Sequence, residues 1–347
     1  MPQPIHVFSD SPLPHAAARR RILSSRAFRR LAHKTQVIAL PADDHLSTRL
    51  THTLEVASVA RDIASSLRHA IDLHLDLVEA IALAHDVGHA PFGHAGEAAL
   101  ARRAADAGLG GFHHAAFGVR LLSRIEIATD GAPVVADADV IDGVLAHSKG
   151  RSGAAFARGA ASLRRSFEAR IVRAADLYAY AAVDLDDAVR LRLFDGRSIP
   201  ARARRELGKD GESIRRSLIR RTVEATLASF ASGGPPALEL DSEGDAALSE
   251  LRAFLYERFY EGPPTADQTR RADDVIGTIW RAFQGDLAGT LDAAGWSRRE
   301  DGSGRPSMRD ALDALACMTD RFAVAFAASC ALQGRRCGSR SPVLTER

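Results

Sequence analysis

An all-α fold is the structure that this sequence predicts. Leu, Ala and Arg, which are strong helix formers, are abundant, whereas aromatic residues make up only 6% of the chain. Apolar residues recur at the three- and four-residue spacing of amphipathic helices, and no series of alternating strands and helices is evident. The 347 residues, 46% of them hydrophobic, are enough to bury a substantial core. We therefore expect one mostly helical bundle with a C-terminal helical extension packed on it.

The N-terminal part divides into an arm and four helices. Residues 1–18 contain four prolines and are expected to form an extended arm. Ser47 and Thr48 are good N-cap residues for the second helix, and Pro91 and Gly93 impose a turn before the fourth. The expected helices are 19–31, 47–67, 76–85 and a segment that opens at residue 94.

The rest of the chain is also expected to be helical. A Gly-Gly pair at 110–111 interrupts the pattern before a helix that is expected to run to Leu121. Residues 126–140 are expected to form a loop or a short hairpin, and residues 148–153 a polar loop. The later helices are expected at 168–193, 206–231, 245–260, 268–284 and 307–331, with Gly-, Pro- and Ser-rich links at 232–244, 261–267 and 296–306. After the arm, we divide the chain into a core at 19–200, a C-terminal helical region at 201–335 and a tail at 336–347.

Charge and cysteine usage exclude several classes of protein. The formal net charge is only +2, which does not support nucleic-acid binding over the whole surface. The three cysteines form no Cys-x-x-Cys pair and no disulfide framework, so a reducing cytoplasm is the expected compartment. No apolar run approaches the roughly 20 residues that span a bilayer, and no membrane partner is expected.

A mixed set of imidazoles and carboxylates indicates a metal site. His85 and Asp86 are adjacent, and His52 and Asp176 lie far away in the sequence on separate expected helices. Nitrogen and oxygen ligands together suit a divalent transition metal or Mn²⁺ better than Ca²⁺. Mn²⁺ or Mg²⁺ is the expected ion, and another transition metal is the alternative. The alternative for His85-Asp86 alone is a helix-terminal pair that satisfies local backbone groups.

Two further patterns lie near these residues. If a helix opens at His94, then His94 and Glu97 share a face one turn apart and form a proton-transfer couple, unless Glu97 only caps the helix start. Asp176, Tyr180 and Asp184 are spaced i, i+4, i+8 and share another helix face. Such a row suits a metal, a sugar ring and a hydroxyl group; the alternative is a solvated acidic stripe.

Several segments, in order, carry a resemblance to a known family. The most specific is HDVGHAPFGHAGE at 85–97, and the others are 25–31 with 34–36, 49–56, 111–114, 175–180 with Asp184, 254–256 and 318–321. On these motifs the chain resembles the deoxyguanosine triphosphate triphosphohydrolase-like proteins of the HD superfamily. The resemblance runs from about residue 19 to residue 330.

The resemblance implies an HD-domain helical bundle that hydrolyses dGTP, or a broader set of deoxynucleoside triphosphates, to deoxynucleoside and inorganic triphosphate. It implies metal ligation by His52, His85, Asp86 and Asp176. It implies catalytic roles for His94, Glu97 and His114. It implies substrate contacts at Gln36, Arg49, His89, Tyr180 and Asp184. His113, Ala115 and Ala90 depart from the usual family residues, which bears on the geometry near the phosphates.

Two basic stretches, at 19–30 and 202–221, suggest further partners. They could bind the phosphates of an allosteric deoxynucleotide. Single-stranded DNA is disfavoured, because little aromatic interleaving accompanies the charge. The alternative is a set of solvated helix faces and ion pairs between subunits. The resemblance also implies a homo-oligomer.

Two other functions stay open at this stage. Another HD-type nucleotidase or phosphodiesterase would share the metal set without needing Gln36, Tyr180 or Asp184. A non-catalytic nucleotide-binding regulator would have lost a metal ligand or His94. Since all of these residues are present, the sequence favours the triphosphohydrolase. The sequence leaves open the base preference, the native metal and whether His94 is a nucleophile or a general acid/base.

Overall fold

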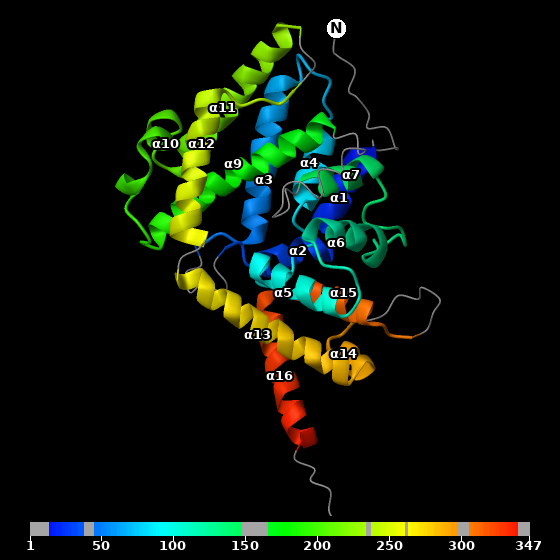
Figure 1. Ribbon diagram of the computed structural model, residues 1–347. Coiled ribbons are helices and arrows are strands. Elements are labelled where there is room, and N and C mark those ends of the chain that lie inside the picture. Colours follow the sequence, from blue (N-terminus) through cyan, green and yellow to red (C-terminus); the bar gives the residue numbers. More distant parts are fainter. Residues whose placement is uncertain are drawn as a thin grey trace, which may run out of the picture.

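Helices make up almost all of the regular structure. The computed structural model describes residues 14–37, 45–147, 166–233, 237–260, 263–296 and 305–338, and helices pack on one another throughout these ranges (Figure 1). The β-type pairing within the same ranges is limited to two isolated bridges, Thr35–Thr48 and Ile127–Pro133. The prediction of an all-α fold is confirmed.

The first helix begins earlier than the sequence suggests, and Ser25 caps a second short helix after it. The elements are α1 (Pro14–Ser24), α2 (Arg26–Arg30) and a 3₁₀ turn (Leu31–His33). Pro14 occupies the first position of α1, where its fixed φ is compatible with a helix and its missing N–H costs nothing. The last five residues of the predicted arm at 1–18 are therefore helical, and its residues 1–13 lie outside the described part of the chain.

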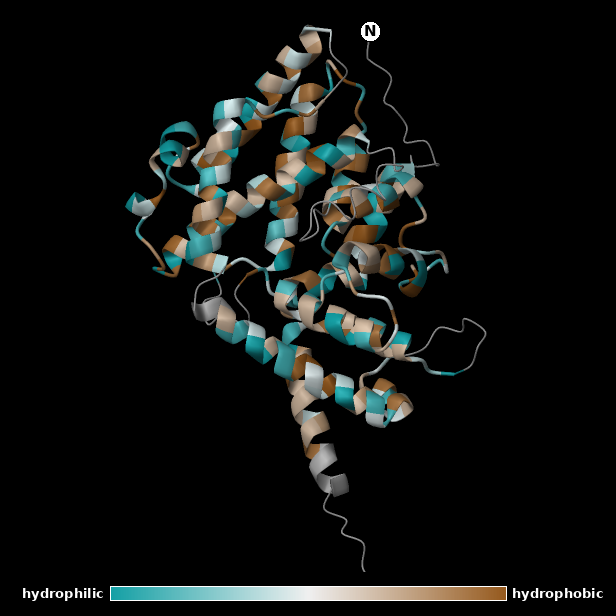
Figure 2. Cartoon of the chain, in the orientation of Figure 1, coloured by the Kyte–Doolittle hydropathy of each residue, from teal (hydrophilic) through white to brown (hydrophobic). Residues whose placement is uncertain are grey.

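The centre of the molecule is built from four helices that pack on one another. They are α3 (Arg49–Leu67), α4 (Leu75–Ala84), α7 (Ala138–His147) and α9 (Phe167–Arg190). Helix α3 packs on both α4 and α9, α7 packs on α4 and α9, and α1 covers α4 (Figure 1). Val56, Ile63 and Leu67 on α3 are fully buried, so burial of this apolar stripe holds the centre together. Polar and apolar bands alternate along these helices in Figure 2.

Two further helices line the turn that follows α4. They are α5 (Gly93–Asp106) and α6 (His114–Arg120), and α6 continues into a π-helical turn (Leu121–Ile125). The predicted loop or hairpin at 126–140 contains the single bridge Ile127–Pro133 and then gives way to α7. The predicted loop at 148–153 lies outside the described residues.

The C-terminal helices form two groups, one packed on the central helix α9 and the other on α5. They are a 3₁₀ turn (Gly196–Ser198), α10 (Ala201–Glu206), α11 (Gly211–Ala231), α12 (Ser242–Leu255) with a π turn (Tyr256–Tyr260), α13 (Pro263–Gly285), α14 (Leu287–Ala293), α15 (Met308–Cys317) and α16 (Asp320–Gly338). Helices α11 and α12 pack on α9, whereas α13 packs on α5 and α16 (Figure 1). No described helix has the length and apolarity to cross a membrane.

The predicted single helix at 307–331 is wrong, because the chain breaks between α15 and α16. Met318 has extended backbone, and α16 restarts at Asp320. The Asp320 carboxylate accepts hydrogen bonds from the backbone N–H groups of Thr35 and Phe92, both at 2.9 Å, and from the Thr35 hydroxyl. The break thus lets one buried carboxylate connect α16 to two distant loops beside the candidate site.

Candidate metal centre

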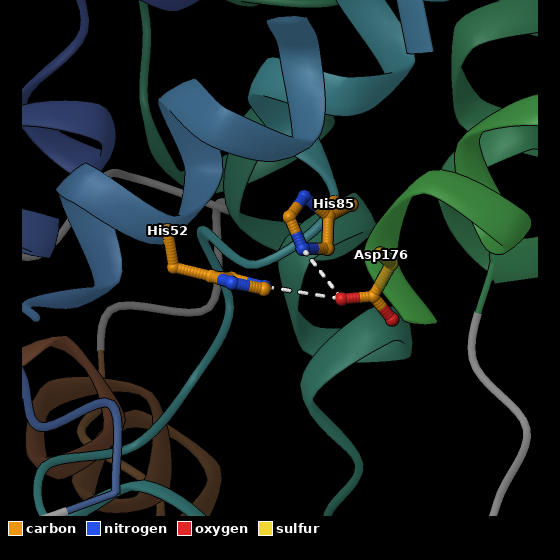
Figure 3. Close-up of side chains that lie close together, drawn as sticks. All are labelled: His52, His85 and Asp176. Atoms are coloured by element: carbon orange, nitrogen blue, oxygen red, sulfur yellow. Dashed lines mark hydrogen bonds and ion pairs between the residues drawn. The ribbon is translucent and has the colours of Figure 1, made fainter. Parts of the chain in front are cut away.

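Three predicted metal ligands converge from three helices. His52 lies in the first turn of α3, His85 directly follows α4, and Asp176 lies on α9 (Figure 3). Asp176 Oδ1 is 3.1 Å from His52 Nε2 and 3.7 Å from His85 Nε2. Figure 3 shows both imidazoles directed at the Asp176 carboxylate. One ligand atom from each residue lies within 4.8 Å of the other two, so this group could hold a metal ion.

The fourth predicted ligand, Asp86, lies beside this group. Its Oδ1 is 3.4 Å from His85 Nε2 and 3.3 Å from His89 Nε2, and its Oδ2 is 2.6 Å from Arg49 Nη1. Burial by itself would raise the pKa of Asp86, but the charges of His85, His89 and Arg49 outweigh it and hold the pKa well below its usual range. Asp86 is therefore an ionised carboxylate in a buried site, which favours a nearby cation.

The donor atoms fit a divalent cation. His85 Nδ1 lies 2.7 Å from the Ala82 carbonyl oxygen, which can only accept, so Nδ1 carries the proton and Nε2 presents its lone pair. That Nε2 atom is buried and has no hydrogen-bond partner. This orientation of a metal-binding imidazole by a backbone carbonyl is common. Imidazole nitrogens and carboxylate oxygens together suit Mn²⁺, Mg²⁺ or a transition metal.

Glu97 connects two of the predicted catalytic histidines. Its Oε1 accepts hydrogen bonds from His114 N and Nδ1, at 2.8 and 2.9 Å, and its Oε2 is 3.3 Å from His94 Nδ1. Burial opposes ionisation of Glu97, but the charge and hydrogen bond of His114, together with the hydrogen bond of His94, lower its pKa far below the usual range. The His94 side chain is 67% exposed, whereas that of Glu97 is 13% exposed. His94 is thus the accessible member of the couple.

The turn between α4 and α5 is shaped by glycines. A Cβ atom at Gly88 would lie 2.1 Å from the His114 carbonyl oxygen and 2.3 Å from Gly118 N, so only glycine lets this turn reach α6. Phe92 and Gly93 have φ values of 65° and 58°, and this pair reverses the chain into α5. The close packing brings the His85-Asp86 pair and His114 into one site.

Two predicted substrate contacts are fully buried. Arg49 has no exposed side-chain area and pairs with Asp86, so in this structure it is directed at the candidate metal ligands. Gln36 is 3% exposed, and neither of its side-chain polar atoms has a hydrogen-bond partner. Lys34, two residues before Gln36, donates to the carbonyl oxygens of His89 and Ala316, and burial lowers its pKa to about 7. The unpartnered amide of Gln36 could contact a ligand.

The acidic row on α9 has mixed surroundings. The Tyr180 ring lies beside that of His52, with centroids 4.5 Å apart. Asp184 is 1% exposed, and burial raises its pKa to about 7. Tyr260 donates a hydrogen bond to Asp184 Oδ2, while Asp184 Oδ1 has no partner. The alternative of a solvated acidic stripe is therefore wrong for Asp184.

Sequence reasoning missed two residues here. Tyr260 ends the π turn after α12, and no pattern in the sequence connects it with Asp184. His147 is the last residue of α7, is 2% exposed, and has its Nε2 3.3 Å from His114 Nε2. Burial, followed by the charges of His85 and His114, lowers the pKa of His147 to about 3. A signal was present, since His147 falls three residues after Val144 on the apolar stripe of its helix.

Comparisons with known proteins show the family of this chain. A family model described as "HD domain" matches residues 49–181, and one described as "Phosphohydrolase-associated domain" matches residues 238–329. Three relatives bear the name deoxyguanosinetriphosphate triphosphohydrolase-like protein. That of Desulfatibacillum aliphaticivorans is 34% identical over 88% of this chain and 84% of its own length. That of Caldanaerobacter subterraneus subsp. tengcongensis is 37% identical over 88% of this chain and 81% of its own length. That of Paracoccus denitrificans is 36% identical over 88% of this chain and 90% of its own length.

Proposed function

Because this chain belongs to the deoxyguanosinetriphosphate triphosphohydrolase-like proteins of the HD-domain family, we propose that it hydrolyses deoxynucleoside triphosphates to deoxynucleoside and inorganic triphosphate. The observation that carries the proposal is the group of His52, His85 and Asp176, with the Asp86 carboxylate 3.4 Å from His85. The exposed His94 lies near it, since its ring centroid is 5.2 Å from that of His89, which contacts Asp86. A triphosphate bears several negative charges, and a cation-binding centre next to an accessible imidazole suits its hydrolysis.

The four ligands would hold a divalent ion, with Mn²⁺ and Mg²⁺ as the candidates. When bound, the ion supplies positive charge that polarises the phosphate oxygens. Arg49 fixes the Asp86 carboxylate through a 2.6 Å ion pair and adds positive charge to the site. Both effects favour binding of a polyanion.

His94 is proposed to carry the proton transfer or the nucleophilic attack. Its Nδ1 faces Glu97, so the Nε2 atom is left to act toward the substrate. Glu97 also holds His114 by two hydrogen bonds, and we propose that His114 acts near the phosphates. In the overall reaction, the oxygen of one water molecule bonds to the α-phosphorus and the bond from the α-phosphorus to the 5′-oxygen of the deoxynucleoside breaks. One proton of that water ends on the 5′-oxygen as it leaves.

The sugar is proposed to lie against α9. The unpartnered Asp184 Oδ1 can accept a hydrogen bond from the 3′-hydroxyl, and the Tyr180 ring can pack against the 2′-carbon. His89 and Gln36 are proposed as further contacts, since each has a buried polar atom without a partner. A 2′-hydroxyl would crowd Tyr180, which favours deoxynucleotides.

Incubation with each of the four dNTPs, alone and mixed, with Mn²⁺ or Mg²⁺ tests this function. Deoxynucleoside with intact triphosphate is the expected product pair. Deoxynucleoside monophosphate with pyrophosphate, or orthophosphate alone, would instead indicate an HD-type nucleotidase or phosphodiesterase. Absence of turnover in every condition would favour a nucleotide-binding regulator.

We also propose a cytoplasmic homo-oligomer that responds to nucleotides. Activity that appears only in dNTP mixtures would support an allosteric site. Arg220 and Arg221 in the second basic stretch pair with acidic side chains of the same chain, such as Glu224 and Asp241. These partners reduce the charge offered to single-stranded DNA, which stays the disfavoured partner.

A further inference from the structure

We propose that Arg170 and Arg173 of α9 bind the β- and γ-phosphates of the substrate in a pocket beside the candidate metal centre. The inference rests on the proposed hydrolysis of deoxynucleoside triphosphates, and it names the residues that would select a triphosphate. The pocket has a volume of about 340 Å³, within the range of ligand sites, about 300–1,000 Å³. Its walls come from the end of α7, the first half of α9 and the segment 238–248, which leads into α12.

The pocket begins next to the predicted metal ligands on two helices. Ala146 lines it and precedes His147 at the end of α7, and Leu177 lines it and follows the predicted ligand Asp176 on α9. The ring centroid of His147 is 5.0 Å from that of His85, another predicted ligand. A molecule bound at the predicted ligands therefore has the pocket within reach.

The order of residues along α9 gives the direction of the substrate. The proposed sugar contacts, Tyr180 and Asp184, come after the predicted ligand Asp176. Arg173 and Arg170 come three and six residues before it, which is about 4.5 and 9 Å along the helix axis at a rise of about 1.5 Å per residue. The β- and γ-phosphates extend from the α-phosphate away from the sugar, and so toward these two arginines.

The two arginines suit phosphates in both position and chemistry. They are three residues apart on α9 and line the same pocket, so they lie on one face of the helix. Guanidinium groups bind phosphate oxygens through paired, charge-assisted hydrogen bonds, which are stronger than those between neutral groups. Arg173 is half-buried and Arg170 is exposed, so we expect Arg173 to make the stronger contact.

The opposite wall of the pocket carries negative charge. Glu239 and Asp245 line it, and Glu239 Oε1 accepts a hydrogen bond from the Ser229 hydroxyl at 3.0 Å. Asp245 is exposed in the first turn of α12. Carboxylates repel phosphates, so the terminal phosphates lie on the α9 side of the pocket. Loss of the Asp245 charge should therefore have the opposite effect to loss of an arginine.

Binding of inorganic triphosphate tests this inference without turnover. Isothermal titration calorimetry is carried out on the Mn²⁺-loaded full-length chain at low ionic strength. Arg173→Gln should weaken binding at least about 10-fold, because a charge-assisted hydrogen bond is lost. Arg170→Gln should weaken it about 2- to 5-fold, since its side chain is exposed. Asp245→Asn should strengthen it, because a repelling charge is removed.

The matched control is Arg271→Gln, which changes an exposed arginine of α13 and should bind triphosphate as the wild type does. Unchanged binding in either Arg173→Gln or Arg170→Gln would overturn the inference. Binding in Asp245→Asn that is not stronger than in the wild type would also overturn it.

Steady-state kinetics separate this role from a structural one. The terminal phosphates do not react, so both arginine variants should raise KM for dGTP with a smaller effect on kcat. Failure of this inference is distinguishable from failure of the proposed function. Triphosphate release with wild-type KM and wild-type triphosphate affinity in the arginine variants overturns only the phosphate contacts. Weakened triphosphate binding in these variants, without triphosphate release from any dNTP by the wild type, overturns only the proposed reaction.

Discussion

Replacement of Asp184 by Asn should make the protein more stable at alkaline pH. Burial raises the pKa of this carboxyl to about 7, against an ordinary value of 3.8, so the folded state prefers its neutral form. This preference stabilises the folded state fully when the pH is below 3.8, the ordinary pKa that Asp184 has in the unfolded chain. The stabilisation is lost as the pH rises through about 7, the pKa of Asp184 in the folded state. The amide of Asn is neutral at every pH and its oxygen can still accept the hydrogen bond from Tyr260.

The size of the effect follows from these two pKa values. Between pH 5 and pH 8, linkage gives a loss of about 2.5 kcal/mol in the free energy of unfolding from Asp184 alone. Relative to wild type, Asp184→Asn should therefore be about 1.5 kcal/mol more stable at pH 5 and about 4 kcal/mol more stable at pH 8.

Urea unfolding at the two pH values, in the presence of chelator, measures this difference. Asp292→Asn is the matched control, since Asp292 is exposed, and it should follow the wild-type profile. A difference between wild type and Asp184→Asn that does not change with pH would refute the burial argument for this carboxyl.

Three further predictions concern the same site. His94→Ala should lower turnover at least about 100-fold, because the proton-transfer group is lost. Equilibrium dialysis should show that the variant binds Mn²⁺ as the wild type does. Full activity of the variant would remove His94 from the mechanism. Gly88→Ala should lower the free energy of unfolding by about 1–3 kcal/mol, because the added Cβ clashes with α6. Gly111→Ala, with open space at its Cβ, should change this free energy little. Equal urea midpoints for the two variants would contradict the packing argument. GTP should be hydrolysed much more slowly than dGTP if Tyr180 packs against the 2′-carbon, and equal kcat/KM values would count against that contact.

Local patterns sufficed for much of the fold and for the metal group. Apolar periodicity gave most of the helices, because each buries one stripe against a common centre. The predicted ligands His52, His85 and Asp176 meet because helices α3, α4 and α9 cross there. Their assignment as metal ligands stays a prediction.

The remaining features depend on contacts between distant segments. The break before α16 lies within a continuing apolar pattern, and Asp320, where α16 begins, accepts hydrogen bonds from Thr35 and Phe92, far away in the sequence. His147 was overlooked because its partner His114 is on another helix. Arg49 was predicted to contact substrate, yet its observed partner Asp86 is itself a candidate ligand, which the sequence could not reveal.

Hydrolysis of dGTP in ¹⁸O-labelled water, followed by mass spectrometry of both products, tests the proposed reaction most directly. If the α-phosphorus is attacked and the 5′-oxygen leaves, one ¹⁸O atom should appear in inorganic triphosphate and none in the deoxynucleoside. Label in deoxyguanosine, in its monophosphate or in pyrophosphate would show that a different bond breaks and would contradict the proposed function.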